Sequence, residues 1–404
     1  MTLLNGIHRS LYIRYESNQN ENGLGGMMQQ MDIVGDDLVY PSNNTWFLQV
    51  YNWNGVANEN AQDVRFPYRT YYRIIRNANT ILGAVDASTG PDADKKVLKG
   101  QALLYRAFSH YQLVQIFGKR YVNGVDNSQM GVPLALTVSD QPLARATVEQ
   151  VYAQINKDLD EANTLLVGYT KPNNSHLGLS VAQGLKARVA LTQGNWAIAA
   201  DYAAKAKTGV ALMNAEEYVK GFNDFNAKEW MWGSHVNEVQ TDYFGNFGAY
   251  MSRNFSSTVI RVCPKAINSK LYNLIPTTDV RSKLFDKTGA HASLNLSSAF
   301  AKFPYTSQKF LAVSTGDARC DIPYMRVAEM YLIEAEAKAK LGQADAAAVL
   351  FALVKTRDTG YTLSTKTGQA LVDEIWFQRR IELWGEGFRF YDLKRTNSPL
   401  DRSG

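Results

Sequence analysis

Two stretches of similar pattern decide the expected fold: ARVALTQGNWAIAADYAAKA at residues 187–206 and EAKAKLGQADAAAVLFALVK at residues 336–355. In each stretch a glycine, Gly194 or Gly342, separates two segments whose apolar residues follow a helical spacing. Small or apolar residues follow each glycine at the same three offsets, namely Ala199, Ala203 and Ala206 in the first stretch and Ala347, Phe351 and Val354 in the second. Both stretches are therefore predicted to form helical hairpins with closely packed helices.

This spacing resembles the tetratricopeptide pattern, in which small residues let paired helices stack as repeats. The alternative is a pair of alanine-rich hairpins that are similar by chance. Apolar residues at three- and four-residue spacings predict helices over residues 66–85, 97–117, 147–166, 180–193, 196–207, 324–341, 344–357 and 368–384. Thr147 and Gln150 form a capping-box pattern at the start of one of them. The expected fold is mostly α, a tetratricopeptide-like scaffold with an inserted region of loops and short strands.

The composition is that of a globular protein. Apolar residues make up 45% of the 404 residues and charged residues 20%, which does not indicate disorder. The 43 basic and 38 acidic residues nearly balance, and no run of five Lys or Arg occurs, so we expect no nucleic-acid partner. The apolar run AAAVLFALV at residues 346–354 is about half as long as the ~20 residues of a membrane-spanning helix, and is predicted to be a core helix.

Sequence signatures of metal sites, cofactors and catalysis are missing. Cys263 and Cys320 are the only cysteines, which excludes a cysteine-rich metal site and favours two buried thiols over a disulfide. The five histidines lie far apart, without a spacing that would place two on one helix face. A phosphate-binding loop and a nucleophile elbow are both absent. We predict no metal, no cofactor and no catalytic residue.

The helical period fades between the two hairpins. Residues 209–322 are rich in Asn, Ser, Tyr, Phe, Gly and Pro, and the alternation at residues 229–236 fits a short strand. We divide the chain into an N-terminal part, residues 1–208, and a C-terminal part, residues 209–404. The C-terminal part consists of the irregular insert and then, over residues 323–404, a helical hairpin with a charged run. We expect both parts to form one compact unit.

Two irregular segments combine aromatic rings with amide side chains. Trp and Tyr rings stack on the C–H faces of sugars, and amides supply directional hydrogen bonds to hydroxyl groups. The predicted glycan contacts are Asn43, Asn44, Trp46, Tyr51 and Trp53 before the first long helix, and Tyr243, Asn246, Phe247 and Tyr250 in the insert. The alternative is that these aromatic rings fill the core beneath long loops.

Seven segments occur in an order that is itself informative: LLNGIHRSLY (3–12), RTYYRIIRNANTIL (69–82), GQALLYRAFSHYQLVQIFGKRYV (100–122), GVPLAL (131–136), RATVEQVYAQINKDLDEA (145–162), DIPYMRVAEMYLIEAEAKAKLG (321–342) and RRIELWGEGFRFYDLKR (379–395). Together they resemble the SusD/RagB family, the surface-exposed glycan-capturing lipoproteins of Bacteroidetes. The resemblance covers nearly the whole chain.

The resemblance also implies a role for the charged run at residues 379–395, as a structural signature that Arg380, Glu382, Glu386, Arg389, Asp392 and Arg395 match. Opposite charges can be buried together when they pair, so we interpret the run as an internal clamp. An enzyme would instead use Glu382 and Glu386 as acid and base. A glycosidase acid needs a raised pKa, however, and carboxylates beside several arginines should stay ionised.

The resemblance implies a non-enzymatic binding protein at the outer-membrane surface that delivers a glycan to a SusC-like, TonB-dependent transporter. Members of the family carry an N-terminal lipid anchor; the opening MTLLNGIHRSLYIRY shows no such signal, so the anchor is an implication of the resemblance alone. Two alternatives stay open: a helical-repeat protein of the same uptake class that binds peptides or proteins, and a glycan hydrolase, which would release reducing ends.

Overall fold

The computed structural model describes residues 2–16, 18–45, 47–240 and 242–403. About 48% of the chain is helical, as the sequence predicts. The described α-helices are α1 (Thr2–Ser10), α2 (Gly23–Ile33), α3 (Leu48–Tyr51), α4 (Gln62–Ala84), α5 (Asp92–Phe117), α6 (Val148–Leu165), α7 (Leu179–Gln193), α8 (Trp196–Lys207), α9 (Ala215–Tyr218), α10 (Gly248–Met251), α11 (Thr258–Val262), α12 (Ser269–Tyr272), α13 (Val327–Lys340), α14 (Ala346–Val354), α15 (Gly368–Glu382) and α16 (Arg389–Thr396). Within the described ranges, no helix has the length and apolarity needed to cross a bilayer.

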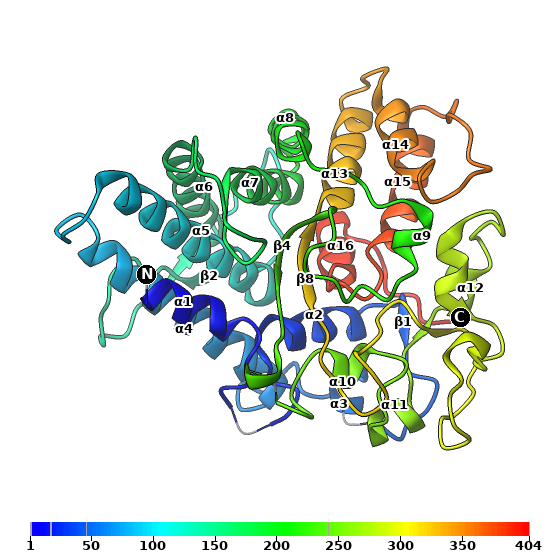
Figure 1. Ribbon diagram of the computed structural model, residues 1–404. Coiled ribbons are helices and arrows are strands. Elements are labelled where there is room, and N and C mark those ends of the chain that lie inside the picture. Colours follow the sequence, from blue (N-terminus) through cyan, green and yellow to red (C-terminus); the bar gives the residue numbers. More distant parts are fainter. Residues whose placement is uncertain (1, 17, 46, 241, 404) are drawn as a thin grey trace.

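The long helices form one continuous stack (Figure 1). Each of α4 to α8 packs against the next, α13 packs against α8, and α14 and α15 pack against α13. The α7–α8 and α13–α14 hairpins are therefore neighbours although more than a hundred residues separate them in the sequence. Ala199, Ala203 and Ala206 are fully buried on α8, which agrees with small residues permitting close helix contact. The predicted tetratricopeptide-like scaffold is confirmed.

Local signals set several helix ends. The Thr147 side chain accepts from the Gln150 backbone N–H at 3.1 Å, and the Gln150 side chain accepts from the Thr147 N–H at 2.9 Å. This reciprocal capping box is the one predicted from the sequence. At the α7–α8 turn, Gly194 adopts a left-handed conformation with φ 71°, and Asn195 caps α8. A glycine is favoured at such a helix end because it has no Cβ.

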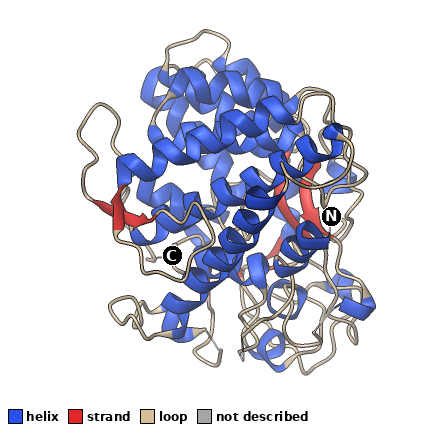
Figure 2. Ribbon diagram, turned by 90° about the vertical axis from the view of Figure 1, so that its left-hand side faces the viewer, coloured by secondary structure: helices blue, strands red, loops and turns tan. Residues whose placement is uncertain are grey.

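The strands are short and few (Figure 2). They are β1 (Leu38–Val39), β2 (Met130–Pro133), β3 (Arg145–Thr147), β4 (Trp230–Ser234), β5 (Ala266–Ile267), β6 (Phe285–Asp286), β7 (Thr306–Ser307) and β8 (Ile322–Arg326). The strand expected at residues 229–236 is β4, which pairs antiparallel with β8. The helix expected from Tyr324 begins only at Val327, because residues 322–326 pair with β4 instead.

The four-stranded sheet joins the early irregular segment to the insert. Its strand order is β1-β5-β7-β6, and β1 pairs antiparallel with β5 so that Leu38 lies opposite Ile267. The sheet contains one strand from before α4 and three from the insert. Backbone hydrogen bonds thus hold together the two irregular segments in which the glycan contacts were predicted.

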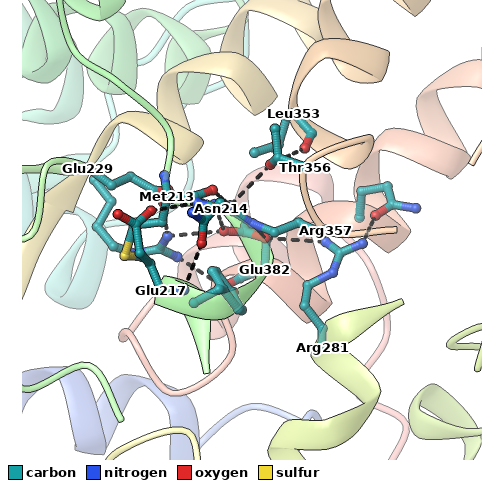
Figure 3. A network of polar contacts seen from close by, with 12 residues as sticks. Met213, Asn214, Glu217, Glu229, Arg281, Leu353, Thr356, Arg357 and Glu382 are labelled. Atoms are coloured by element: carbon teal, nitrogen blue, oxygen red, sulfur yellow. Dashed lines mark hydrogen bonds and ion pairs between the residues drawn. The ribbon is translucent and has the colours of Figure 1, made fainter. Parts of the chain in front are cut away.

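Charged side chains connect the insert to the C-terminal helices inside the protein. Glu382 at the end of α15 is fully buried and lies 3.3 Å from Arg281, 3.0 Å from Arg326 and 3.1 Å from Arg357. Glu229 pairs with the same Arg326 and Arg357. Figure 3 shows Glu229, Arg357 and Glu382 gathered at this point. The network is shared between the insert, β8 and the ends of α14 and α15.

The other residues of the charged run also pair, mostly with distant parts of the chain. Buried Glu386 lies 2.6 Å from both Lys309 and Arg326. The remaining pairs are Arg380 with Asp37, Arg389 with Asp36 and Asp37, Arg395 with Glu336, and Asp392 with Arg379 and Arg395. Among the described acidic residues of the run, only Asp392 pairs with basic residues of the run itself. Most partners come from the insert, the early segment or α13.

Acid is expected to destabilise the protein through His110, which is fully buried on α5. Burial lowers the pKa of His110 to about 3, while an unfolded histidine titrates near 6.5. Between these values the unfolded state binds a proton that the folded state does not, so stability is lost as pH falls. The loss of unfolding free energy that comes from His110 approaches about 1.4 kcal/mol for each pH unit.

Urea unfolding of the wild type and a His110→Gln variant at pH 7, 5.5 and 4.5 isolates this group from other titrating residues. We expect the difference in unfolding free energy between the two proteins to shrink with each step toward acid. A difference that is constant over this range would show that His110 titrates normally in the folded protein.

Candidate functional site

An open groove of about 790 Å³ lies where the early irregular segment meets the start of α4. Its walls come from the loop after α1, from α3, from the turn after α3 and from the first residues of α4. The residues lining it are Arg14, Asn18, Gln19, Asn20, Phe47, Gln49, Val50, Asn54, Gly55, Ala61, Gln62 and Asp63. Half of these side chains are amides, which can both donate and accept hydrogen bonds.

Hydrogen bonds between the amides hold the groove in shape. Asn54 Nδ2 donates to Gln49 Oε1 at 2.7 Å, and Gln62 Nε2 donates to Asn20 Oδ1 at 3.1 Å. The second bond connects the loop after α1 to the start of α4. Within the described residues, the Asn54 oxygen and the Gln49 nitrogen have no partner, so both are available to a ligand.

The insert meets the groove through Asp242, and the two aromatic residues that follow it, Tyr243 and Phe244, are called the rim aromatics here. Asp242 lies 2.6 Å from Arg14, which lines the groove. The next two residues, Tyr243 and Phe244, are 50% and 43% exposed. Their rings contact each other edge to face at 4.6 Å, and Tyr243 also contacts buried Phe255 at 5.1 Å. This packing holds the Tyr243 ring in place while leaving part of it open to solvent.

Contacts in the core beneath the groove explain why the two segments meet there. Phe47, just before α3, contacts Tyr250 of α10 edge to face at 5.0 Å, and Figure 1 shows α3 and α10 close together. The Cys263 thiol lies 3.2 Å from the Ser42 carbonyl oxygen. Both Cys263 and Cys320 are buried free thiols, as the sequence predicts.

The early aromatic residues of the predicted site face a different part of the molecule. The Tyr51 ring stacks on Tyr40 at 5.0 Å, with the Arg402 guanidinium 4.2 Å from its centroid. Trp53 is 38% exposed, donates from its indole N–H to the Val34 carbonyl oxygen at 3.1 Å and lies 6.3 Å from Phe390. No contact among the described residues joins either ring to Tyr243.

The remaining predicted residues divide into exposed and buried ones. Asn43 and Asn44 are exposed, and Trp46 lies outside the described residues. Asn246, Phe247 and Tyr250 are only 1–2% exposed. Asn246 Oδ1 accepts a hydrogen bond from the Ala249 N–H at 3.0 Å, and Phe247 packs on Phe310 at 4.9 Å. As a correction, a ligand at this surface does not reach these three side chains, which fill the core beneath the loop.

Sequence reasoning missed most of the groove lining. Asn18, Gln19 and Asn20 belong to the amide-rich run SNQNENG at residues 17–23, a compositional signal as strong as the one at Asn43 and Asn44. Phe244 directly follows the predicted Tyr243. By contrast, Gln49, Gln62 and Asp63 lie on helices and give no local signal, because only the folded chain brings them to the groove.

Two sequence models of known protein families match this chain. A sequence model of the family described as "Starch-binding associating with outer membrane" matches residues 12–191, and a model of the SusD family matches residues 281–403. The two ranges cover most of the chain without overlapping. The chain belongs to the SusD/RagB family.

Solved structures of SusD-like proteins share the whole fold. A SusD-like carbohydrate-binding protein from Bacteroides vulgatus is 26% identical, with a TM-score of 0.85 over 99% of this chain and 83% of that one. A SusD superfamily protein from Bacteroides thetaiotaomicron is 23% identical, with a TM-score of 0.83 over 100% and 89%. A laminarin-binding SusD-like protein is 21% identical, with a TM-score of 0.75 over 98% and 90%. No curated protein sequence matches the chain.

In this SusD-like protein, the two family models leave residues 192–280 unmatched. That stretch includes Tyr243 and Phe244, whereas the amide-lined wall of the groove falls within residues 12–191. The candidate site therefore combines a wall from the family-matched region with a rim from the part of the chain that neither model describes.

Proposed function

We propose that the protein is a non-enzymatic glycan-binding protein of the cell surface. The observation that carries this proposal is the groove, which six amide side chains line and which Asp242, directly before the exposed rings of Tyr243 and Phe244, contacts through Arg14. Amides can satisfy several sugar hydroxyl groups at once, and aromatic rings cover the apolar face of a sugar. The groove is open, so it suits a chain of sugar residues that extends beyond it.

Family membership supports the same conclusion. One matching family is described as starch-binding and associated with the outer membrane, and the structural neighbours include a carbohydrate-binding and a laminarin-binding protein. We propose an outer-membrane location through an N-terminal lipid anchor, and delivery of the captured glycan to a SusC-like, TonB-dependent transporter. Co-purification of such a transporter with the tagged protein from cell envelopes tests the delivery step.

The electrostatics of Glu382 and Glu386 argue against these two residues as the acid and base of a hydrolase. Burial alone would raise the pKa of Glu386, but Arg326 and Lys309 outweigh it and lower the pKa. Burial likewise opposes ionisation of Glu382, yet Arg357, Arg326 and Arg281 hold its pKa well below the ordinary range. A general acid for glycoside hydrolysis needs a carboxyl group that is protonated near neutral pH.

A binding screen tests the proposal. We expect the purified protein to retain at least one polysaccharide in affinity gel electrophoresis, to bind its oligosaccharides in calorimetry and to release no reducing ends from them. Tight binding of a peptide library with no retention of any glycan would favour the peptide-binding alternative. Release of reducing ends would show that the protein is a hydrolase.

A further inference from the structure

Two charged side chains line the groove, and only one of them has an ion-pair partner among the described residues. Arg14 and Asp63 are the only charged residues among those lining it. Arg14 is already paired with Asp242 at 2.6 Å. Within the described part of the chain, the Asp63 carboxylate forms no hydrogen bond and no ion pair. A ligand in the groove therefore meets one uncompensated negative charge and no free cation from the lining.

The position of Asp63 is fixed by the backbone around it. It lies in the first turn of α4, where its charge complements the helix dipole. Its carboxylate also packs against Gly55, since a Cβ on Gly55 would lie 2.5 Å from Asp63 Oδ1. Gly55 belongs to the turn after α3, which also lines the groove. Among the described residues, the carboxylate thus lies against the turn after α3, partly buried and without a hydrogen-bond donor.

We infer that the groove selects uncharged glycans and that Asp63 sets this selectivity, an inference that rests on the proposed function. An ionised carboxylate only accepts hydrogen bonds, and sugar hydroxyl groups supply the donors that it lacks. A uronate or sulfate group would bring a second negative charge close to the half-buried Asp63 carboxylate, and like charges repel each other. Selectivity then comes from repulsion of the wrong ligand as well as attraction of the right one.

The test uses calorimetry with matched pairs of sugars. Maltoheptaose, laminarihexaose and cellohexaose are each titrated as the neutral sugar and after oxidation of C6 to a uronate, beside homogalacturonan, alginate and chondroitin sulfate. We expect any neutral sugar that binds to bind at least ten-fold more tightly than its oxidised form. In an Asp63→Asn variant we expect weaker binding of the neutral sugar. We also expect the ratio of the dissociation constants, oxidised sugar over neutral sugar, to be at least five-fold smaller than in the wild type.

Asp94→Asn is the matched control, because Asp94 is an exposed aspartate in the first turn of α5 and its removal changes the net charge equally. It should leave the ratio unchanged. If Asp63 has a purely structural role, Asp63→Asn lowers stability but leaves the ratio at its wild-type value. That result would overturn the inference.

The outcomes separate this inference from the proposed function. Binding of an anionic glycan that is lost in a Tyr243→Ala variant would overturn the selectivity and leave glycan binding in the groove intact. If no glycan binds, neutral or anionic, the proposed function itself fails and the inference fails with it.

Discussion

Replacing Glu382 with alanine is expected to lower the free energy of unfolding by about 4 kcal/mol. The carboxylate is fully buried and lies within 3.3 Å of three arginines. Removing it leaves buried positive charges without their counter-charge, which costs more than the ion pairs contribute when complete. Urea unfolding followed by circular dichroism measures the loss. Glu382→Gln, which keeps the side-chain volume, is expected to show a loss of similar size.

Glu216→Ala is the matched control. Its side chain is 84% exposed and lies 3.8 Å from Lys220, so we expect a change within about 0.5 kcal/mol. Glycan affinity of the folded protein should stay at the wild-type level in all three variants. Normal stability of Glu382→Ala together with lost glycan binding would contradict the structural role and place the ligand at the charged run.

Removing both rim aromatics, Tyr243→Ala with Phe244→Ala, is expected to weaken glycan binding by on the order of 10- to 100-fold. A ring that stacks on a planar ligand contributes about 1–3 kcal/mol, a range taken from base stacking. Both rings are about half exposed, so the loss of stability should be small. Calorimetry with the best oligosaccharide, beside thermal unfolding, separates the two effects.

The matched control for the rim is Tyr202→Ala on α8, a partly exposed tyrosine that belongs to the helical stack. It should bind as the wild type does. Trp53→Ala serves as a second comparison, because Trp53 faces Val34 and Phe390. Unchanged binding in the double variant with strong loss in Trp53→Ala would move the ligand to the side of the protein where Tyr51 and Trp53 lie.

The long helices could be predicted because their signals are local. The capping box of Thr147 and Gln150 and the turn at Gly194 depend on residues close in the sequence, and both occur as expected. Helix α2 could not be predicted in this way, because its sequence GLGGMMQQMDI contains three glycines. Gly26 is required there by tertiary packing, since a Cβ on it would lie 2.2 Å from the Asn20 carbonyl oxygen.

The strand at residues 322–326, like α2, could not be predicted from local signals. Its apolar spacing continues that of α13, and only the pairing with β4 draws it out of the helix. The charged run was correctly expected to hold buried charges. Lys309, Arg326 and Glu336, however, lie more than fifty residues from the charges with which they pair, and carry no local signal.

The candidate site was only partly predictable from composition. An aromatic, amide-rich segment indicates a binding loop, but it does not tell which rings point outward. Tyr243 and Tyr250 lie in the same segment, yet one is 50% exposed and the other 2%. The groove itself is formed by three separate segments, and its two charged lining residues are identified only once the chain is folded.

Hydrogen–deuterium exchange with and without a saturating oligosaccharide tests whether a glycan binds in the groove, because it locates the ligand without a mutation. We expect slower exchange of backbone amides in peptides covering residues 14–20, 47–63 and 242–250, with no change in the charged run at residues 379–395. Protection confined to the charged run, or to grooves between the stacked helices, would show that the glycan does not bind in the groove.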